Sequence, residues 1–177
     1  MMQLQHIFLI GARASGKTSL ARVLSKELVL PMRDADAVFV ERIGQSIAEF
    51  VEDKGWDAFR NMEAQILAEL CSGEPLVVAT GGGVVLRPEN RALLKSSGLA
   101  VYLKAEADIL LARLGKNPLP GQRPALTGLD EAEEIRKTLA EREPLYQECA
   151  DLVLDADQPL DESARVIMNY LEKMEKA

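Results

Sequence analysis

Cysteine, histidine and aromatic residues are scarce in this sequence. Its 177 residues include two cysteines, one histidine and one tryptophan, and aromatic residues make up only 5% of the chain. Cys71 and Cys149 lack the close spacing of metal ligands, so we expect neither a disulfide framework nor a zinc site, but free thiols in a reducing cytoplasm. His6 begins an apolar run away from the polar motifs, and we interpret it as structural.

Long apolar stretches and an excess of positive charge are also missing. No run is long enough to cross a bilayer, and the N-terminus has no signal-peptide pattern. The formal net charge of -7 argues against nucleic acid or an anionic membrane as a partner. We therefore expect a cytoplasmic monomer, with residues 1–177 forming a single domain that binds any anionic ligand through local positive groups.

Short apolar runs alternate with helical patterns along the chain. This alternation is typical of βαβ units and predicts an α/β fold with a parallel sheet covered by helices on both faces. Apolar positions and capping signals predict helices over 17–30, from Ser46 to a stop at Gly55, and over 56–70, 88–95, 106–114 and 161–174. The five expected strands are 6–10, 32–33, 76–79, 99–103 and 152–154.

Residues 11–18, Gly-Ala-Arg-Ala-Ser-Gly-Lys-Thr, fit the P-loop pattern G-x-x-x-x-G-K-[ST] between an expected strand and an expected helix. In such a loop the backbone N–H groups and the helix N-terminus form a cradle for phosphate oxygens. Lys17 would reach the β- and γ-phosphates, and the Thr18 hydroxyl would ligate Mg²⁺. A glycine-rich turn with an exposed lysine is the alternative, but the strand and helix context favours nucleoside triphosphate binding.

Two further motifs follow expected strands, where parallel sheets place their ligands. Asp34 and Asp36 offer one carboxylate for a magnesium shell and one to accept a proton, although a pair of helix-capping aspartates would look the same. Gly81-Gly82-Gly83 permits close backbone approach to a ligand, although a loose strand exit is equally compatible.

The segment from Gly115 to Pro124 is rich in glycine, proline and polar residues. Loops of this length are commonly functional or mobile. In a nucleotide enzyme the segment would form a lid over the phosphates, with Arg123 adding positive charge. An insertion with a solvated arginine is the alternative.

Taken together, these motifs resemble the shikimate kinase family along nearly the whole chain. The resemblance rests on six motifs that occur in the family's order: the P-loop at 11–18, Asp34-x-Asp36, Phe59-Arg60, Gly81-Gly82-Gly83, Arg123-Pro124 and Arg142-x-Pro144-Leu145-Tyr146. It implies a three-layer P-loop kinase with a five-stranded parallel sheet in the order 2-3-1-4-5, substrate-binding helices at about 36–62 and a mobile lid at about 115–128. It also implies phosphorylation of the 3-hydroxyl of shikimate by ATP with Mg²⁺.

The resemblance also implies a role for individual residues. The catalytic residues would be Lys17, Asp36 and Arg123, and the metal would be held by Thr18 and Asp34. The acid substrate would contact Asp36, Arg60, Gly81, Gly82, Gly83 and Arg142. The nucleotide would contact Gly11, Ala12, Arg13, Ala14, Ser15, Gly16, Lys17, Thr18, Ser19, Arg113, Arg123 and Gln158.

Several alternatives stay open at this point. Arginine suits bidentate recognition of a carboxylate, but Arg60 could be a helix-surface charge and Arg142 an ion-pair partner on a helix that ends near Pro144. Trp56, four residues before Arg60, belongs either to the core or to the pocket wall. The lid is longer than in many family members, and Ala125 stands where leucine is common. A kinase of another hydroxy acid, such as gluconate, and a catalytically silent nucleotide-binding module are the competing functions.

Overall fold

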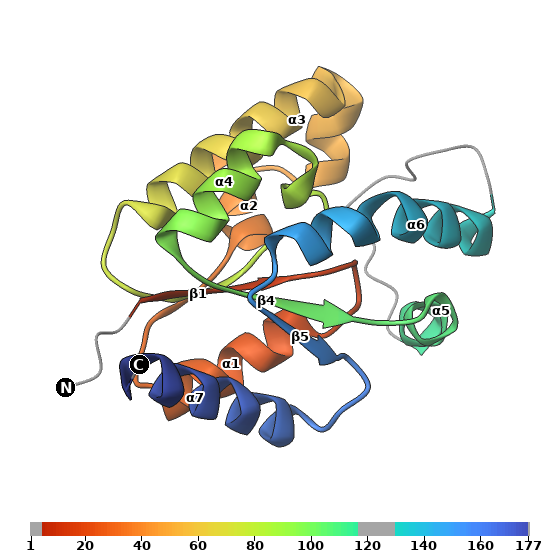
Figure 1. The fold of residues 1–177 in the computed structure, drawn as a ribbon. Helices are drawn as coiled ribbons and strands as arrows, with labels where there is room; N and C mark the ends of the chain where they lie inside the picture. The colour runs from red at the N-terminus through yellow and green to blue at the C-terminus, as the bar shows by residue number, and fades with distance from the viewer. Residues whose placement is uncertain (1–4, 117–129, 177) are drawn as a thin grey trace.

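A parallel sheet of five strands forms the centre of the molecule. The computed structural model (Figure 1) describes residues 5–116 and 130–176, and in it the strands lie in the order β2-β3-β1-β4-β5. Every pair of neighbouring strands is parallel. The predicted fold class and strand order are therefore confirmed. The strands are β1 (His6–Ile10), β2 (Met32–Asp34), β3 (Val77–Ala79), β4 (Gly98–Lys104) and β5 (Leu152–Asp155).

Helices cover both faces of the sheet, so the central strand β1 is buried on both faces. Ile7 and Leu9 of β1 pack with α1 and α7, whereas Phe8 and Ile10 pack with α3, α4 and α6. This two-sided burial explains why β1 is a continuous apolar run rather than an alternating one. The helices are α1 (Lys17–Glu27), α2 (Ala35–Ile43), α3 (Ile47–Cys71), α4 (Pro88–Ser97), α5 (Ala107–Lys116), α6 (Glu131–Cys149) and α7 (Leu160–Lys176), with a 3₁₀ turn η1 (Val84–Leu86).

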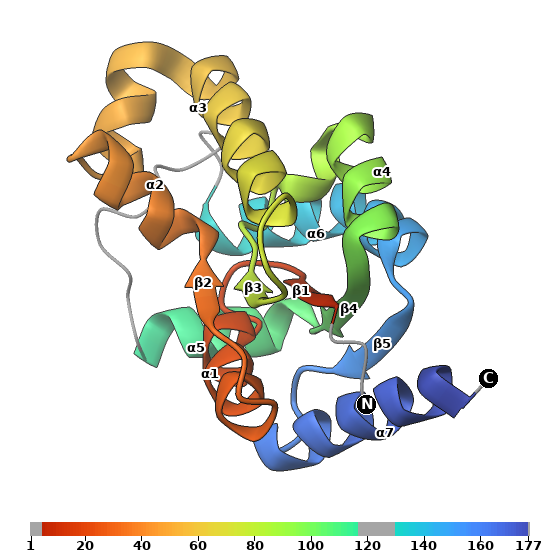
Figure 2. The same ribbon diagram turned by 90° about the vertical axis from the view of Figure 1, so that its left-hand side faces the viewer.

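The helices α2 and α3 have an apolar cluster of their own. Figure 2 shows them at the β2 edge of the sheet, where Phe39, Ile47, Val51, Phe59 and Ile66 pack together. The N-terminus of α3 has the expected capping box between Ser46 and Glu49.

Two helix ends differ from prediction. Helix α1 ends at Glu27 rather than at residue 30, because Val29 takes a positive φ of 54°. Helix α6 does not end near Pro144 but continues to Cys149. Proline costs the helix one backbone hydrogen bond, but Tyr146 and Cys149 beyond it are buried in the core, which favours continuation. The predicted stop at Gly55 is present as a kink inside α3, where φ is 84°.

The structure also bears on the predictions about His6, the two cysteines and membrane-spanning segments. His6 is buried at the start of β1 and lies against the ring of Phe8, which agrees with a structural role. Both cysteines are free thiols. Within 5–116 and 130–176, no helix is long and apolar enough to cross a membrane.

Candidate active site

The loop between β1 and α1 has the backbone conformation of a phosphate cradle. Ala14 and Gly16 have positive φ values of 65° and 94°, so the chain turns sharply before the first turn of α1. A side chain at Gly11 would clash, because a Cβ there would lie 2.7 Å from the Leu103 carbonyl oxygen. The N–H groups of Ala14 and Gly16 donate to no other described residue. They are therefore available to an anion at the N-terminus of α1.

Lys17 is folded back onto this loop. Its Nζ donates to the carbonyl oxygens of Gly11 at 2.9 Å and Ala12 at 2.6 Å, and only 8% of the residue is exposed. The alternative of an exposed turn lysine is therefore wrong. The same contacts keep the ammonium group beside the cradle.

Thr18 and Asp34 meet across the site. The Thr18 hydroxyl donates to Asp34 Oδ2 at 2.7 Å, while Asp34 Oδ1 accepts from the backbone N–H groups of Asp36 at 3.0 Å and Ala37 at 3.2 Å. Asp34 is thus the N-cap of α2, so the capping alternative holds for Asp34 but not for Asp36, while Asp34 also lies beside Thr18, its predicted partner in holding Mg²⁺. The cap also places Asp36 in the first turn of α2.

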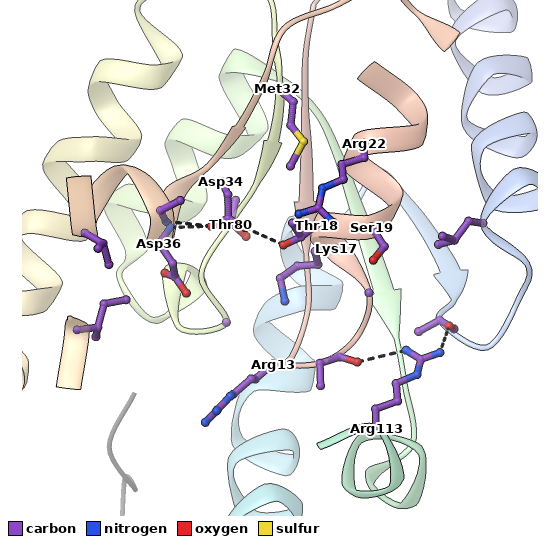
Figure 3. A pocket seen from close by; sticks show the side chains of 18 of the residues that line it. Arg13, Lys17, Thr18, Ser19, Arg22, Met32, Asp34, Asp36, Thr80 and Arg113 are labelled. Atoms are coloured by element: carbon purple, nitrogen blue, oxygen red, sulfur yellow. Dashed lines mark hydrogen bonds between the residues drawn. The ribbon is translucent and has the colours of Figure 1, made fainter. Parts of the chain in front are cut away.

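A pocket of about 1150 Å³ joins these groups. Figure 3 shows Lys17, Thr18, Asp34, Asp36 and Thr80 close together in it. Its lining includes most of the predicted nucleotide residues, both aspartates and the middle glycine of the triple-glycine loop: Arg13, Ala14, Gly16, Lys17, Thr18, Ser19, Asp34, Asp36, Gly82, Arg113 and Gln158. Residues that carried no sequence signal also line it, including Arg22, Met32 and Val40.

Arg113 and Gln158 lie at the α5 and α7 end of this pocket. Arg113 donates to the carbonyl oxygens of Ala14 at 3.2 Å and Ala156 at 2.6 Å, so it links the P-loop to the turn after β5 (Figure 3). Gln158 follows in that turn, with its Oε1 3.5 Å from Ser163 Oγ. The structure therefore places Arg113 and Gln158, two of the predicted nucleotide contacts, in the same pocket as the cradle.

Arg60 is buried against the triple-glycine loop. Its Nη1 pairs with Glu63 Oε2 at 2.6 Å, and 11% and 5% of the two side chains are exposed. A Cβ on Gly83 would overlap the Arg60 guanidinium, so any side chain there would displace the arginine from this position. Arg60 is therefore no surface charge. Sequence reasoning missed Glu63, although its spacing of three residues from Arg60 on one helix was a usable signal.

Trp56 lies against the α2–α3 apolar cluster, one of the two environments that the sequence left open, and it is not among the lining residues of the 1150 Å³ pocket. Its ring packs edge-on against Phe59 at 5.8 Å, within the α2–α3 cluster. The Arg60 guanidinium carbon also lies 5.4 Å from the centre of its indole. Trp56 therefore connects the apolar cluster with the arginine.

Arg142 approaches the same loop from α6. Only 8% of the residue is exposed, and it makes no hydrogen bond or ion pair with another described residue. Its Nη1 lies 3.7 Å from the position that a Cβ on Gly82 would take. Arg60 and Arg142 are not among the lining residues of the 1150 Å³ pocket, but each contacts a glycine of the loop that borders it.

The three glycines offer donors that nothing else in the described chain uses. All three residues are buried, and their N–H groups donate to no other described residue. Buried N–H groups are normally paired, so this loop is suited to a ligand with oxygen acceptors. The lid predicted at about 115–128 falls mainly on residues 117–129, and these, with Arg123, lie outside the described residues.

Comparisons with known proteins bear on the family of this chain. A family model described as shikimate kinase matches residues 13–172. The chain belongs to the shikimate kinase family. A shikimate kinase of Nitratidesulfovibrio vulgaris is 47% identical over 154 residues, which cover 87% of this chain and 88% of that protein.

Solved structures of this family have the same fold. A shikimate kinase of Acinetobacter baumannii in complex with shikimate matches with a TM-score of 0.89 and 31% identity, covering 97% of this chain and 95% of that one. A gluconokinase of Sinorhizobium meliloti matches with a TM-score of 0.61 at 19% identity, covering 98% and 95%. The match to the gluconokinase, at 19% identity, shows only a shared fold. The family model that matches this chain is that of the shikimate kinases.

Proposed function

We propose that this chain transfers the γ-phosphoryl group of ATP to the 3-hydroxyl of shikimate, giving shikimate 3-phosphate and ADP, and that Arg142 binds the carboxylate of the acid. The observation that carries the proposal is the buried Arg142 guanidinium, which has no ion-pair partner in the described chain and lies beside Gly82. A buried cation requires an anion close by, and the carboxylate of the acid substrate would provide it.

Each end of the substrate pair has its own set of residues. The N–H groups of Ala14 and Gly16 would bind phosphate oxygens, and Lys17 would neutralise the charge that develops on the transferring group. Arg60, Arg142 and the N–H groups of the triple-glycine loop would hold the acid. Asp36 lines the pocket between these sets. It would accept the proton of the shikimate 3-hydroxyl while the hydroxyl oxygen bonds to the γ-phosphorus of ATP. The bond from phosphorus to the ADP oxygen breaks in the same transfer.

The paired oxygens of Thr18 and Asp34 fit a magnesium ion. Mg²⁺ prefers oxygen ligands and usually keeps waters and substrate phosphates as its other ligands. Among the residues that the structure describes, no group of three or more acidic, histidine or cysteine side chains could hold a metal by itself, so a site completed by phosphates suits this chain. Thr18 and Asp34 would hold the ion, which when bound supplies positive charge at the phosphates.

The remaining assignments rest on position. Arg113 and Gln158 would contact the nucleotide, since both line the pocket that the P-loop borders. Arg123 as the lid arginine, a monomeric state and a cytoplasmic location stay predictions.

A coupled assay of ADP release tests the proposed function. The purified chain is given ATP and Mg²⁺ with shikimate, with gluconate, or with no acceptor, and phosphorus NMR identifies the phosphorylated oxygen. We expect rapid turnover only with shikimate and a single product phosphorylated at the 3-oxygen. Faster turnover with gluconate than with shikimate would assign gluconate as the substrate. If neither acid accelerated ADP release, the proposed kinase activity would be contradicted.

A further inference from the structure

The Tyr146 hydroxyl contacts the triple-glycine loop at a point where three parts of the site meet. Tyr146 is fully buried near the end of α6, and its hydroxyl donates a hydrogen bond to the Gly82 carbonyl. Arg142 lies one helical turn earlier, so both side chains lie on one face of α6 and both reach Gly82. A Cβ on Gly82 would also lie only 3.4 Å from the backbone nitrogen of Arg13 in the P-loop.

The chain on either side of the glycines is held by other residues. Before them, the Thr80 hydroxyl donates to the Leu9 carbonyl at 2.9 Å. After them, Asn90 Nδ2 donates to the Val84 carbonyl at 2.9 Å, and Arg91 to the next carbonyl. Within the described chain, Tyr146 is the one side chain that forms a hydrogen bond with Gly81, Gly82 or Gly83.

The hydrogen bond from Tyr146 to the Gly82 carbonyl also sets the direction of the Gly83 N–H. The peptide between Gly82 and Gly83 is trans, so its C=O and N–H point in opposite directions. When Tyr146 fixes the carbonyl toward α6, the Gly83 N–H is fixed away from α6. Glycine has unusually wide backbone freedom, so without this bond the peptide plane can rotate.

We propose that Tyr146 is a positioning residue for the acid substrate: its hydroxyl orients the Gly82–Gly83 peptide and thereby the backbone donors that bind the acid beside Arg142. This inference rests on the proposed function, because the substrate is the acid assigned above. The effect is specific to the acid end, since the phosphate cradle takes its donors from another loop.

The chain supplies a matched control in Tyr102. Its ring stacks on that of Tyr146 with centroids 5.0 Å apart, and it is equally buried. Its hydroxyl, however, has no hydrogen-bond partner in the described chain. Tyr102→Phe and Tyr146→Phe therefore remove the same atom from neighbouring buried rings, but only the second removes a bond to the loop.

Steady-state kinetics and nucleotide binding on wild type, Tyr102→Phe and Tyr146→Phe test the proposal. We expect Tyr146→Phe to raise the KM for shikimate roughly three- to tenfold, the range for loss of one neutral hydrogen bond. The affinity for ATP, measured by calorimetry without shikimate, should stay within about twofold of the wild type. Tyr102→Phe should match the wild type in both measurements.

Two outcomes would overturn the proposal: a shikimate KM in Tyr146→Phe equal to that of Tyr102→Phe, or an equal loss of shikimate and ATP binding, which marks general loosening of the core. If Tyr146→Phe is too unstable for the kinetic assay, shikimate and ATP binding to Tyr146→Phe and Tyr102→Phe are compared by calorimetry at low temperature. Absence of shikimate turnover in the wild type and in Tyr102→Phe would instead contradict the proposed function, so the two failures are distinct.

Discussion

The phosphate end of the site takes its groups from eight consecutive residues, whereas the acid end collects them from four separate segments. At the phosphate end, the backbone N–H groups lie in the loop between β1 and α1, and Lys17 is the first residue of α1. At the acid end, Asp36 comes from α2, Arg60 from α3, the glycines from the loop after β3, and Arg142 from α6.

This difference has a physical consequence. A loop fixed by its own backbone geometry keeps its shape when a distant residue changes. A pocket assembled from several helices depends on every helix that carries a part of it. Substitutions at the phosphate end should therefore act on turnover, and substitutions at the acid end should act on the KM for shikimate and on stability as well.

The largest effect is expected at the phosphate end. Lys17→Ala removes the ammonium group that would neutralise the transferring phosphoryl group, so kcat should fall by about a thousandfold or more. The Tm should fall little, because the Lys17 bonds to the Gly11 and Ala12 carbonyls connect it to the adjacent loop and not to a distant element. Lys26→Ala, at an exposed position on the same helix, is the control and should change neither quantity. Near-normal turnover in folded Lys17→Ala would contradict the phosphate assignment.

Asp36 lies between the two ends, and its substitution separates proton transfer from binding. Asp36→Asn keeps the size of the side chain but cannot accept the hydroxyl proton, so kcat should fall by roughly a hundredfold. ATP affinity should not change, because Thr18 pairs with Asp34 rather than with Asp36. Asp57→Asn, an exposed aspartate on α3, is the control. Weakened nucleotide binding with unchanged turnover would reverse the roles of Asp34 and Asp36.

The two arginines of the acid end should affect binding alike but stability differently. Arg60→Ala and Arg142→Ala should each raise the KM for shikimate roughly ten- to hundredfold, because a charge-assisted hydrogen bond contributes about 1.5–3 kcal/mol. Arg60→Ala also leaves Glu63 buried without this cation, so its free energy of unfolding should drop by about 3–5 kcal/mol. Arg142 leaves no such carboxylate behind.

Kinetics and urea denaturation on both arginine variants check this contrast. Glu63→Gln in the Arg60→Ala background should recover part of the lost stability without restoring the KM. An amide analogue of shikimate is the matched ligand: the wild type should bind it more weakly than the acid, and the variants should lose little further. If the variants lose as much with the amide as with the acid, these arginines do not bind the carboxylate.

The same contrast explains what could be predicted from the sequence. The P-loop was recognisable because its residues are consecutive, and strand β1 because burial on both faces makes it uniformly apolar. The motif order suggested which distant residues form the acid end. The contact of Tyr146 with Gly82 depends on side-chain directions in the folded chain and leaves no periodic pattern. The pairing of Arg60 with Glu63 had a signal in its three-residue spacing, but that spacing alone does not show that the pair is buried. The end of α6 was misplaced because the core contacts of Tyr146 and Cys149 outweigh the local effect of Pro144.

Trp56 gives a smaller, optical signal from the acid end. Since its indole lies 5.4 Å from the Arg60 guanidinium, a carboxylate bound by Arg60 should alter its fluorescence saturably. It is the only tryptophan, so the signal needs no assignment. ATP alone should change it less, because the phosphate end lies on another loop. An unchanged spectrum at shikimate concentrations that calorimetry shows to be saturating would assign Trp56 to the apolar cluster alone.

The smallest expected effect concerns Cys149, which packs on α6 next to Tyr146 beneath the acid end. Burial raises the pKa of its thiol to about 11, with a further contribution from Glu148. A raised pKa means that the folded state holds the proton more tightly than the unfolded state. The stability due to the neutral thiol is therefore complete below its unfolded pKa, near 8.5, and is lost as the pH rises through about 11. The difference in urea midpoint between wild type and Cys149→Ser should consequently narrow between pH 9 and pH 11, whereas Cys71→Ser gives the matched baseline for a less buried cysteine.

A thiol reagent at pH 8 should also modify Cys149 only on unfolding. Rapid modification of the native protein, with shikimate binding retained, would mean that α6 opens without disturbing the acid end. The acid end would then depend less on helix packing than its assembly from four segments implies.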